Sequence, residues 1–266
     1  MKTLLKRVAL LALAVLAVVL LHARVRKETE AESAPQDGTA QTAVQQGEGV
    51  QSMSVIRMGE GVTLGRVEAN ENGGVRVIVP AQDGTETAYT FTDVAEDSWY
   101  ASAVNFVVSA GLMTGVNGAD LFHPEYGMPR EEFAAILYRF TKGEPTAEPS
   151  ASFEDVAPDA WYYDAVNWVV GERLMGAIES SQFGIGKFMT CEQALIGLYR
   201  VAGEPETDGS LTDYPYAAKV SESGRSAVDW AWKNGLITEV ECVWYPPQAI
   251  SRAQVALLLM RYSAMA

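Results

Sequence analysis

Histidine and cysteine are scarce in this chain, which has two of each among 266 residues. One histidine falls in the apolar N-terminal segment, so that His123 is alone beyond it. The sequence has no cluster of metal-ligand residues and no G-x-S-x-G motif, the signature of a serine nucleophile. A pair of carboxylates could still hydrolyse a glycoside, although no pair among the 34 acidic residues is singled out by its context. We therefore expect no enzyme, no metal and no cofactor.

Basic residues are few as well. The 20 lysines and arginines stand against 34 aspartates and glutamates, which gives a formal net charge of −14. An acidic surface repels nucleic acid and anionic lipid at long range, and the sequence has no basic patch of the kind that binds nucleic acid. We expect no nucleic-acid partner, and any anionic partner must be held by a local basic feature.

The N-terminus has the pattern of an export signal. Three cations precede an uncharged apolar run at residues 8–21, and small residues follow near residue 23. The run is too short for a bilayer span, which takes about twenty apolar residues. We predict that residues 1–23 are a cleaved signal and that the protein is secreted. A short uncleaved anchor stays open, since three more cations follow the run; the protein would then be tethered to a membrane and face outside.

Two segments precede the main part of the chain. Residues 24–50 are rich in Glu, Gln, Ala, Thr and Gly with almost no large apolar residue, which predicts a disordered, flexible linker. Residues 51–90 contain two β-rich runs, "VTLGRVEA" and "GVRVIVP", separated by "NENGG". This pattern predicts a hairpin in a small β-rich segment.

The rest of the chain repeats one unit three times, at residues 91–143, 153–203 and 211–266. "AVNF" at 103, "AVNW" at 165 and "AVDW" at 227 are each 62 residues apart, and two other landmarks keep a spacing of 61 or 62. "FTDVAEDSWY" begins the first unit and "FEDVAPDAWYY" the second, whereas the third has a blurred "LTDYPYA". Such self-similarity is the signature of a repeat architecture.

Each unit has the pattern of a helix, a loop and a second helix, because its apolar residues recur with a period of 3.6. In the first unit the two apolar stripes consist of Trp99, Ala103, Phe106, Val107 and Ala110, and of Phe133, Ile136, Leu137 and Phe140. Two short helices cannot cover both stripes within one unit, so neighbouring units must bury them. We predict a mainly α fold in which the three repeats pack as a pseudo-threefold bundle, preceded by the small β segment.

The sequence marks where the second helix of each unit begins. Thr190 with Gln193, and Ser251 with Gln254, form capping boxes, in which the hydroxyl and the amide satisfy each other's backbone N–H groups. The first unit has Pro129 in place of the hydroxyl residue. We expect Pro129 to be the first helical residue, with no side-chain cap before it.

Arginine follows the cap in two of the three units, as Arg130 and Arg252, and Cys191 takes this place in the second unit. A cation in the first turn of a helix opposes the helix dipole by about 0.3–1 kcal/mol, so stability alone would not select it. A guanidinium beside free N–H groups forms an anion site. The alternative is a solvated arginine paired with a nearby acid such as Glu131. Because an exported chain meets an oxidising environment, one disulfide between Cys191 and Cys242 is possible, and the sequence does not decide whether it forms.

At this register the units resemble the S-layer homology domains of bacterial surface proteins. The first unit carries "FTDV", Trp99, "AVNF", "GLMTG", "LFHP" and "PREE", and the other two match in outline. The resemblance implies a three-repeat helical bundle that binds secondary polysaccharides of the cell wall without a covalent bond. These polymers commonly carry pyruvate ketals on N-acetylmannosamine. It also implies that the protein lies in the cell wall or S-layer and that the grooves between repeats hold the anionic glycan.

The family's arginine and glycines map onto some positions of this chain and not others. The second unit has Arg173 and Ala177 in place of the two glycines, and the third has Glu239 in place of the second glycine. We therefore expect one or two working grooves. The predicted polysaccharide-binding residues are Arg130, Arg252, Gly111, Gly115, Gly235 and Trp244.

The tryptophans divide into two groups. Trp99 and Trp161 face an apolar stripe at a helix start, where we expect core packing. Trp244 lies in the loop of the third unit, where we expect it to be exposed as a platform for a sugar ring. The main alternative function is a structural or protein-interaction role in the envelope, with degenerate repeats that no longer bind glycan. The sequence leaves the oligomeric state open.

Overall fold

The computed structural model describes residues 53–58, 62–71, 73–116, 120–145 and 152–265. The predicted signal and linker lie outside these ranges. Within them, no helix is long and apolar enough to cross a membrane. Residues 50–266 form one compact unit of the chain, and the following description concerns this unit.

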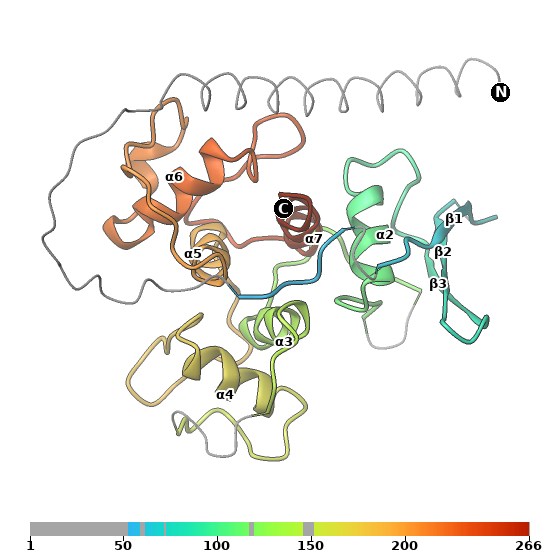
Figure 1. Cartoon of the computed structure of the whole chain (residues 1–266), viewed down its shortest axis with the longest axis horizontal. Helices are drawn as coiled ribbons and strands as arrows, with labels where there is room; N and C mark the ends of the chain where they lie inside the picture. Colours follow the sequence, from blue (N-terminus) through green and yellow to red (C-terminus); the bar gives the residue numbers. More distant parts are fainter. Residues whose placement is uncertain (1–52, 59–61, 72, 117–119, 146–151, 266) are drawn as a thin grey trace, which may run out of the picture. The chain divides into compact units, whose positions relative to one another are not determined.

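A small antiparallel sheet begins the described chain (Figure 1). Its strands are β1 (Arg66–Ala69), β2 (Val75–Pro80) and β3 (Glu86–Phe91), in the order β1-β2-β3. The first two form the predicted hairpin, in which Ala69 pairs with Val75. The third strand, paired from Val75↔Phe91 to Pro80↔Glu86, was not predicted. Val75 and Val77 of β2 are buried, and β2 packs against the first helix of the first repeat.

Six α-helices make up three helix-loop-helix units in the described ranges. They are α2 (Ala101–Ser109), α3 (Arg130–Phe140), α4 (Tyr163–Gly171), α5 (Cys191–Val201), α6 (Arg225–Lys233) and α7 (Arg252–Ser263). Two 3-10 turns, at Ala217–Lys219 and Glu222–Gly224, precede α6. The fold is therefore mainly α with a small β segment, as predicted.

The helix starts confirm two predictions and correct one. Both capping boxes are present, at Thr190 with Gln193 and at Ser251 with Gln254. Pro129 is the N-cap residue of α3 and not its first helical residue, because its ψ of 149° is extended. The prediction for Pro129 was wrong; the helix begins at Arg130, and the cap position has no side-chain hydrogen bond.

The three units close into a ring. Helix α3 packs on α4, α5 packs on α6, and α7 packs on α2, so that each second helix covers the first helix of the next unit. The predicted stripe residues Phe106, Val107, Phe133 and Leu137 are all buried in these contacts. The last unit therefore closes on the first, as the predicted bundle requires (Figure 1).

Three backbone hydrogen bonds link the loops that precede the second helices. The N–H of Met128 donates to the carbonyl of Ile250 (2.8 Å), Ile250 donates to Met189 (2.9 Å), and Met189 donates to Met128 (2.8 Å). The three residues are 61 positions apart in the sequence, and all are buried. Each unit thus gives one bond and receives one, which is the pattern expected around a pseudo-threefold axis.

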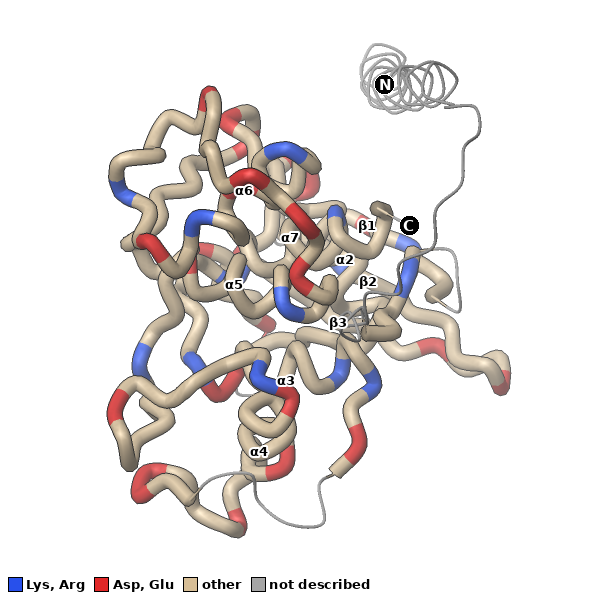
Figure 2. Tube along the Cα trace, turned by 60° about the vertical axis from the view of Figure 1, so that its left-hand side comes forward, with Lys and Arg blue, Asp and Glu red and all other residues tan. Residues whose placement is uncertain are grey.

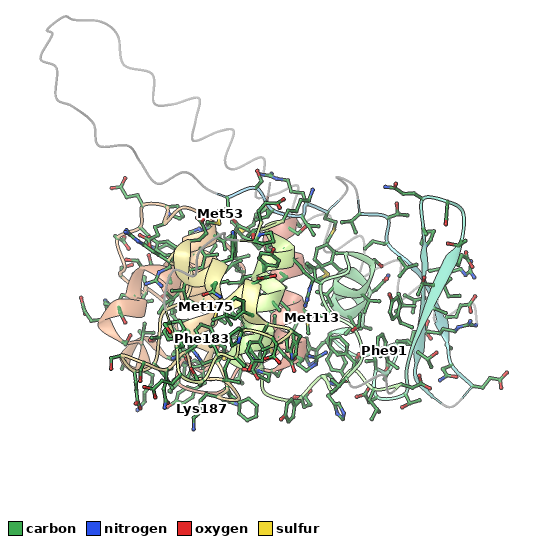
Figure 3. The ribbon with its side chains drawn as sticks, turned by 90° about the horizontal axis from the view of Figure 1, so that it is seen from below. Met53, Phe91, Met113, Met175, Phe183 and Lys187 are labelled. Carbon is green, nitrogen blue, oxygen red and sulfur yellow. The ribbon has the colours of Figure 1, made fainter. Side chains whose placement is uncertain are left out.

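An extended segment at residues 53–58, which we call the strap, crosses the other end of the second helices. The N–H groups of Met53, Ile56 and Met58 donate to carbonyls in the last residues of α5, α3 and α7, at 3.0, 2.9 and 3.2 Å. Carbonyls at helix C-termini have no partner within the helix, so the strap satisfies one in each unit. Figure 3 shows Met53 and Lys187 at opposite ends of the bundle.

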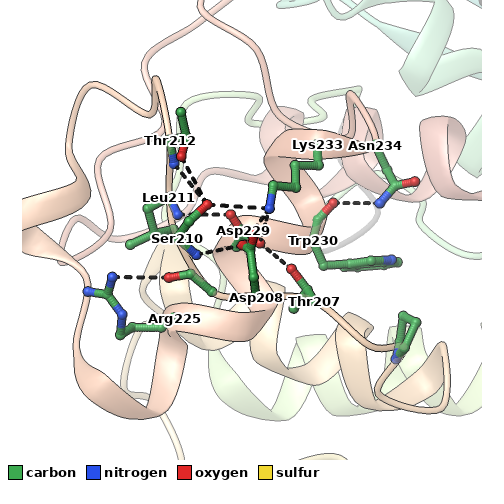
Figure 4. Close-up of polar contacts among 12 residues, drawn as sticks. Thr207, Asp208, Ser210, Leu211, Thr212, Arg225, Asp229, Trp230, Lys233 and Asn234 are labelled. Carbon is green, nitrogen blue, oxygen red and sulfur yellow. Dashed lines mark hydrogen bonds and ion pairs between the residues drawn. The ribbon is translucent and has the colours of Figure 1, made fainter.

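A buried carboxylate holds the lead-in of the third unit (Figure 4). Asp229 on α6 accepts hydrogen bonds from the N–H of Leu211 (2.9 Å) and the hydroxyl of Thr207, and it pairs with Lys233 (2.9 Å). Its side chain is fully buried. Burial opposes ionisation, but the hydrogen bonds from Thr207 and Lys233 outweigh this effect and lower the pKa of Asp229.

Replacing Asp229 by asparagine, the residue at this position in the other two units, tests this contact. We expect the free energy of unfolding at pH 7 to fall by about 1–3 kcal/mol, because the buried ion pair with Lys233 is lost. A carboxyl group whose pKa is lower in the folded state stabilises that state at pH values above its unfolded pKa of about 3.9. This stabilisation is lost as the pH falls through the folded pKa. Urea unfolding at pH 7 and at acid pH should therefore show the difference between the two proteins shrinking in acid.

The matched control is Asp213→Asn, at an exposed position in the same lead-in. We expect it to change stability by less than about 0.5 kcal/mol at either pH. If Asp229→Asn had the same effect at both pH values, the carboxylate would not be the stabilising group.

Candidate functional site

Arg252 crosses from the third unit into the loop of the first. Its guanidinium donates to the carbonyls of Phe122 (2.8 Å) and Thr114 (2.9 Å) and pairs with Glu132 (2.7 Å). It lies 5.0 Å from the centre of the Phe122 ring, and the residue is only 5% exposed. Burial lowers the pKa of this guanidinium, while Glu132 opposes the shift. The backbone of the first unit thus fixes the side chain in place.

Arg130 makes the equivalent contact from the first unit into the second. It donates to the carbonyls of Phe183 (2.8 Å) and Gly176 and lies 4.8 Å from the centre of the Phe183 ring. It is 5% exposed, and burial likewise lowers its pKa. The alternative of a solvated arginine paired with Glu131 was wrong, because Glu131 accepts from the N–H of Gly186 (2.9 Å).

The third contact of this kind has a different chemistry. Cys191 takes the arginine position, and the hydroxyl of Tyr214 donates to the carbonyl of Trp244, which corresponds to Phe122 and Phe183. Cys191 is buried, and burial raises its pKa to about 12. Cys191 and Cys242 are both free thiols, so the disulfide that the sequence left open is not formed.

A groove of about 250 Å³ lies beside α3, where side chains of all three units meet. Arg252 reaches it from the third unit, Arg139 belongs to α3 of the first, and Trp161 comes from the second. The lining residues are Leu112, Met113, Thr114, Gly115, Val116, Glu132, Ile136, Arg139, Trp161 and Arg252. Two cations and one carboxylate give the groove a positive balance in a chain of net charge −14.

The cations of this groove are held by the backbone. Arg139 donates through two nitrogens to the carbonyl of Leu112, at 2.8 and 3.2 Å. Acidic and basic residues are otherwise interspersed along the described trace (Figure 2). The positive groove is therefore the local basic feature that an anionic partner would need.

The predicted site residues separate in the structure. Arg252 and Gly115 line the groove, whereas Gly111 and Gly235 are not among its lining residues. These two glycines follow the ends of α2 and α6 with φ of 67° and 69°, a left-handed conformation that ends a helix. Arg173 takes the same conformation in the second unit. The end of the preceding helix therefore explains why glycine stands at positions 111 and 235, without requiring a role in binding.

Two predictions about tryptophan exposure were wrong. Trp244 is 2% exposed, so its ring faces cannot offer an open platform for a sugar. Trp161 was expected in the core, yet it is 66% exposed at the groove. Sequence reasoning missed Trp161, Arg139 and Glu132 as groove residues. The positions of Phe122 and Phe183 in the other units, both fully buried, are a signal that could have placed Trp244 in the core.

Comparison with known families agrees with this architecture. The model of the S-layer homology domain matches residues 90–134 and 152–195, which cover most of the first unit and most of the second. These two units are S-layer homology domains. The third helix-loop-helix unit lies outside the two matched segments, but it has the same pair of helices. Its second helix begins with a capping box like that of α5, and its Arg252 is buried like Arg130 of α3.

Two relatives carry the same kind of sequence. The chain is 32% identical over 157 residues to the "Surface-layer 125 kDa protein" of Lysinibacillus sphaericus. The aligned stretch is 57% of this chain and 13% of that protein. It is 28% identical over 138 residues to the "Cell surface protein" of Thermoanaerobacter kivui, and this stretch is 50% of this chain and 18% of that protein. The likeness therefore spans less than a fifth of either relative.

Proposed function

We propose that this protein is a cell-surface anchoring module that binds an anionic cell-wall polysaccharide in the groove beside α3. The observation that carries the proposal is the meeting of Arg252, Arg139 and the exposed Trp161 in one groove. The names of the two relatives support a cell-surface location, and the predicted export signal agrees with it.

The chemistry of the groove suits an acidic sugar. Arg139 is exposed and is held by the carbonyl of Leu112, which lowers the entropic cost of presenting its guanidinium to a carboxylate. Glu132 offsets one of the two cations, so one positive charge remains for the ligand. The exposed face of Trp161 can pack against the C–H face of a sugar ring. A pyruvate ketal on an amino sugar is one ligand with both features.

The other two units are less suited to the same ligand. Ala177 and Glu239 stand where the first unit has Gly115. A carboxylate at the position of Glu239 repels an anion, and the arginine that would enter the third unit from the second is replaced by Cys191. We therefore propose that the groove beside α3 is the principal glycan site.

A binding assay on isolated cell walls tests the proposal. We expect Trp161→Ala to weaken binding about tenfold, since a contacting aromatic side chain contributes more than about 1 kcal/mol. Gly115→Glu, which copies the third unit, should weaken it at least as much by charge repulsion. Arg252→Ala is a poor probe, because its loss would leave the buried carbonyl of Phe122 unpaired.

Phe188→Ala is the matched control, because Phe188 is an exposed aromatic residue that does not line the groove. It should bind like the parent protein. Binding should also be lost when the secondary polymer is stripped from the walls. Equal retention on stripped walls would contradict glycan binding and support a structural or protein-interaction role.

A further inference from the structure

The third unit contains a second cavity, of about 60 Å³, away from the groove beside α3. It lies between the lead-in to α6 and the loop that follows this helix. The lining residues are Tyr214, Pro215, Tyr216, Trp232, Thr238, Glu239, Cys242, Val243 and Trp244. Pro215, Glu239 and Val243 are exposed, so the cavity opens to the surface, whereas Tyr214 and Trp244 are buried.

The equivalent positions of the other two units are occupied by a cation from the same chain. The guanidinium of Arg252 lies over Phe122 and donates to the carbonyl of Thr114, and Arg130 does the same at Phe183 and Gly176. In the third unit these positions are Trp244 and Thr238, both of which line the cavity. Cys191 stands in place of the arginine and brings no charge, so this unit has the ring without its internal cation.

The lining is suited to a cation from outside. Its four aromatic residues, Tyr214, Tyr216, Trp232 and Trp244, replace Val94, Glu96, Val108 and Phe122 of the first unit. Tyr214 stands edge-on to Tyr216 and Trp232, with ring centres 6.0 and 5.3 Å apart. Glu239 is the one acidic residue in the lining, and no basic residue lines it. Aromatic rings grouped around a carboxylate are a recognised site for organic cations.

One lining residue also has a hydrogen-bond donor without an acceptor. Nε1 of Trp244 is the one buried side-chain nitrogen or oxygen without a partner in the part of the chain that the structure describes. A buried donor left unpaired costs about 1–3 kcal/mol. A cationic nitrogen cannot accept this hydrogen bond, but an oxygen atom close to it can. The ligand that meets all of these groups therefore carries a cationic nitrogen and a nearby hydroxyl.

We propose that this cavity binds a small organic cation of the amino-alcohol class, with the cationic nitrogen among the aromatic rings and beside Glu239 and the hydroxyl oxygen accepting from Trp244. A space of about 60 Å³ holds the cationic end of such a molecule but not a whole sugar. The acidic chain favours the approach of a cation. This site takes the opposite charge to the groove beside α3 and does not depend on the function proposed for that groove.

Isothermal titration of the protein with choline, ethanolamine and glucosamine tests the proposal, and glucose serves as the neutral control. We expect choline and ethanolamine to bind with a dissociation constant on the order of 1 mM or below. Glucosamine should bind more weakly than ethanolamine, because the cavity does not hold a whole sugar. Absence of saturable binding by both choline and ethanolamine, or equal binding of glucose, would overturn the proposal.

Three variants locate the binding in this cavity. Glu239→Gln should weaken choline binding about fivefold, the effect expected for one exposed ionic contact. Cys191→Arg supplies the internal cation of the other units and should abolish binding. Glu206→Gln, which removes the same charge from an exposed position outside the lining, should bind like the parent.

Trp244→Phe introduces the residue of the other two units and removes the N–H donor while keeping an aromatic ring. It should weaken ethanolamine binding about threefold, the loss of one modest hydrogen bond. The midpoint of urea unfolding shows whether each variant is folded. If folded Glu239→Gln and Cys191→Arg both bound choline like the parent, the site would not be this cavity.

Discussion

Replacement of Arg130 by methionine is expected to lower the free energy of unfolding by about 3–5 kcal/mol. The substitution keeps most of the apolar volume but removes the donors to the buried carbonyl of Phe183 and the part-buried carbonyl of Gly176. Both carbonyls belong to the second unit, whereas Arg130 begins the second helix of the first. The variant therefore weakens a contact between units, and urea unfolding followed by circular dichroism measures the loss.

Two further variants show whether the loss comes from the guanidinium of Arg130. Lys187→Ala removes an exposed cation of the second unit and should change stability by less than about 0.5 kcal/mol. Arg130→Lys should lie between the parent and Arg130→Met, because a single ammonium lacks the planar fork that reaches two carbonyls. A loss for Arg130→Met no larger than that for Lys187→Ala would mean that the guanidinium does not hold the units together.

Removal of the strap is expected to have an effect of similar size. A chain that begins at Val62 should be less stable by about 3–5 kcal/mol than a chain that begins at Val50, where the compact unit starts. It loses the three backbone hydrogen bonds to α5, α3 and α7 and exposes the surface under Met53, Val55 and Ile56, which pack on the core. Urea unfolding of the two chains under the same conditions measures the difference.

Ile56→Pro tests the middle one of the three strap contacts by itself. It removes the N–H that donates to the carbonyl of Phe140 and the side chain of Ile56 but keeps the rest of the strap, so it should cost less than truncation. Equal stability of the two truncated chains would show that the strap lies on the bundle without stabilising it.

The features that sequence predicted well are local or periodic ones. The capping boxes of α5 and α7 depend on residues three positions apart, and the apolar stripes follow one helical period. The closed bundle followed from the 61- or 62-residue repeat, because stripes that cannot be covered within a unit must be covered by the next. The hairpin was likewise a local pattern.

The features that sequence missed depend on contacts between distant residues. The pattern identified Arg130 and Arg252 as unusual, but their carbonyl partners lie more than 40 residues away in another unit. Trp161 was assigned to a helical stripe, although α4 begins only at Tyr163 and helical periodicity does not apply before that residue. The strap has no periodicity that marks it, since its backbone and not its side chains makes the decisive bonds.

The strap also fixes the order in which the module would yield to a mechanical load. A pull on the chain upstream of Met53 would peel the strap first from α5, then from α3 and last from α7, because its three bonds follow one another along the chain. Tension would next reach Gly65, whose N–H and carbonyl are bonded to Ser109 and Asn105 of α2. The bundle would meet the force through all three units in succession before the β-sheet is strained.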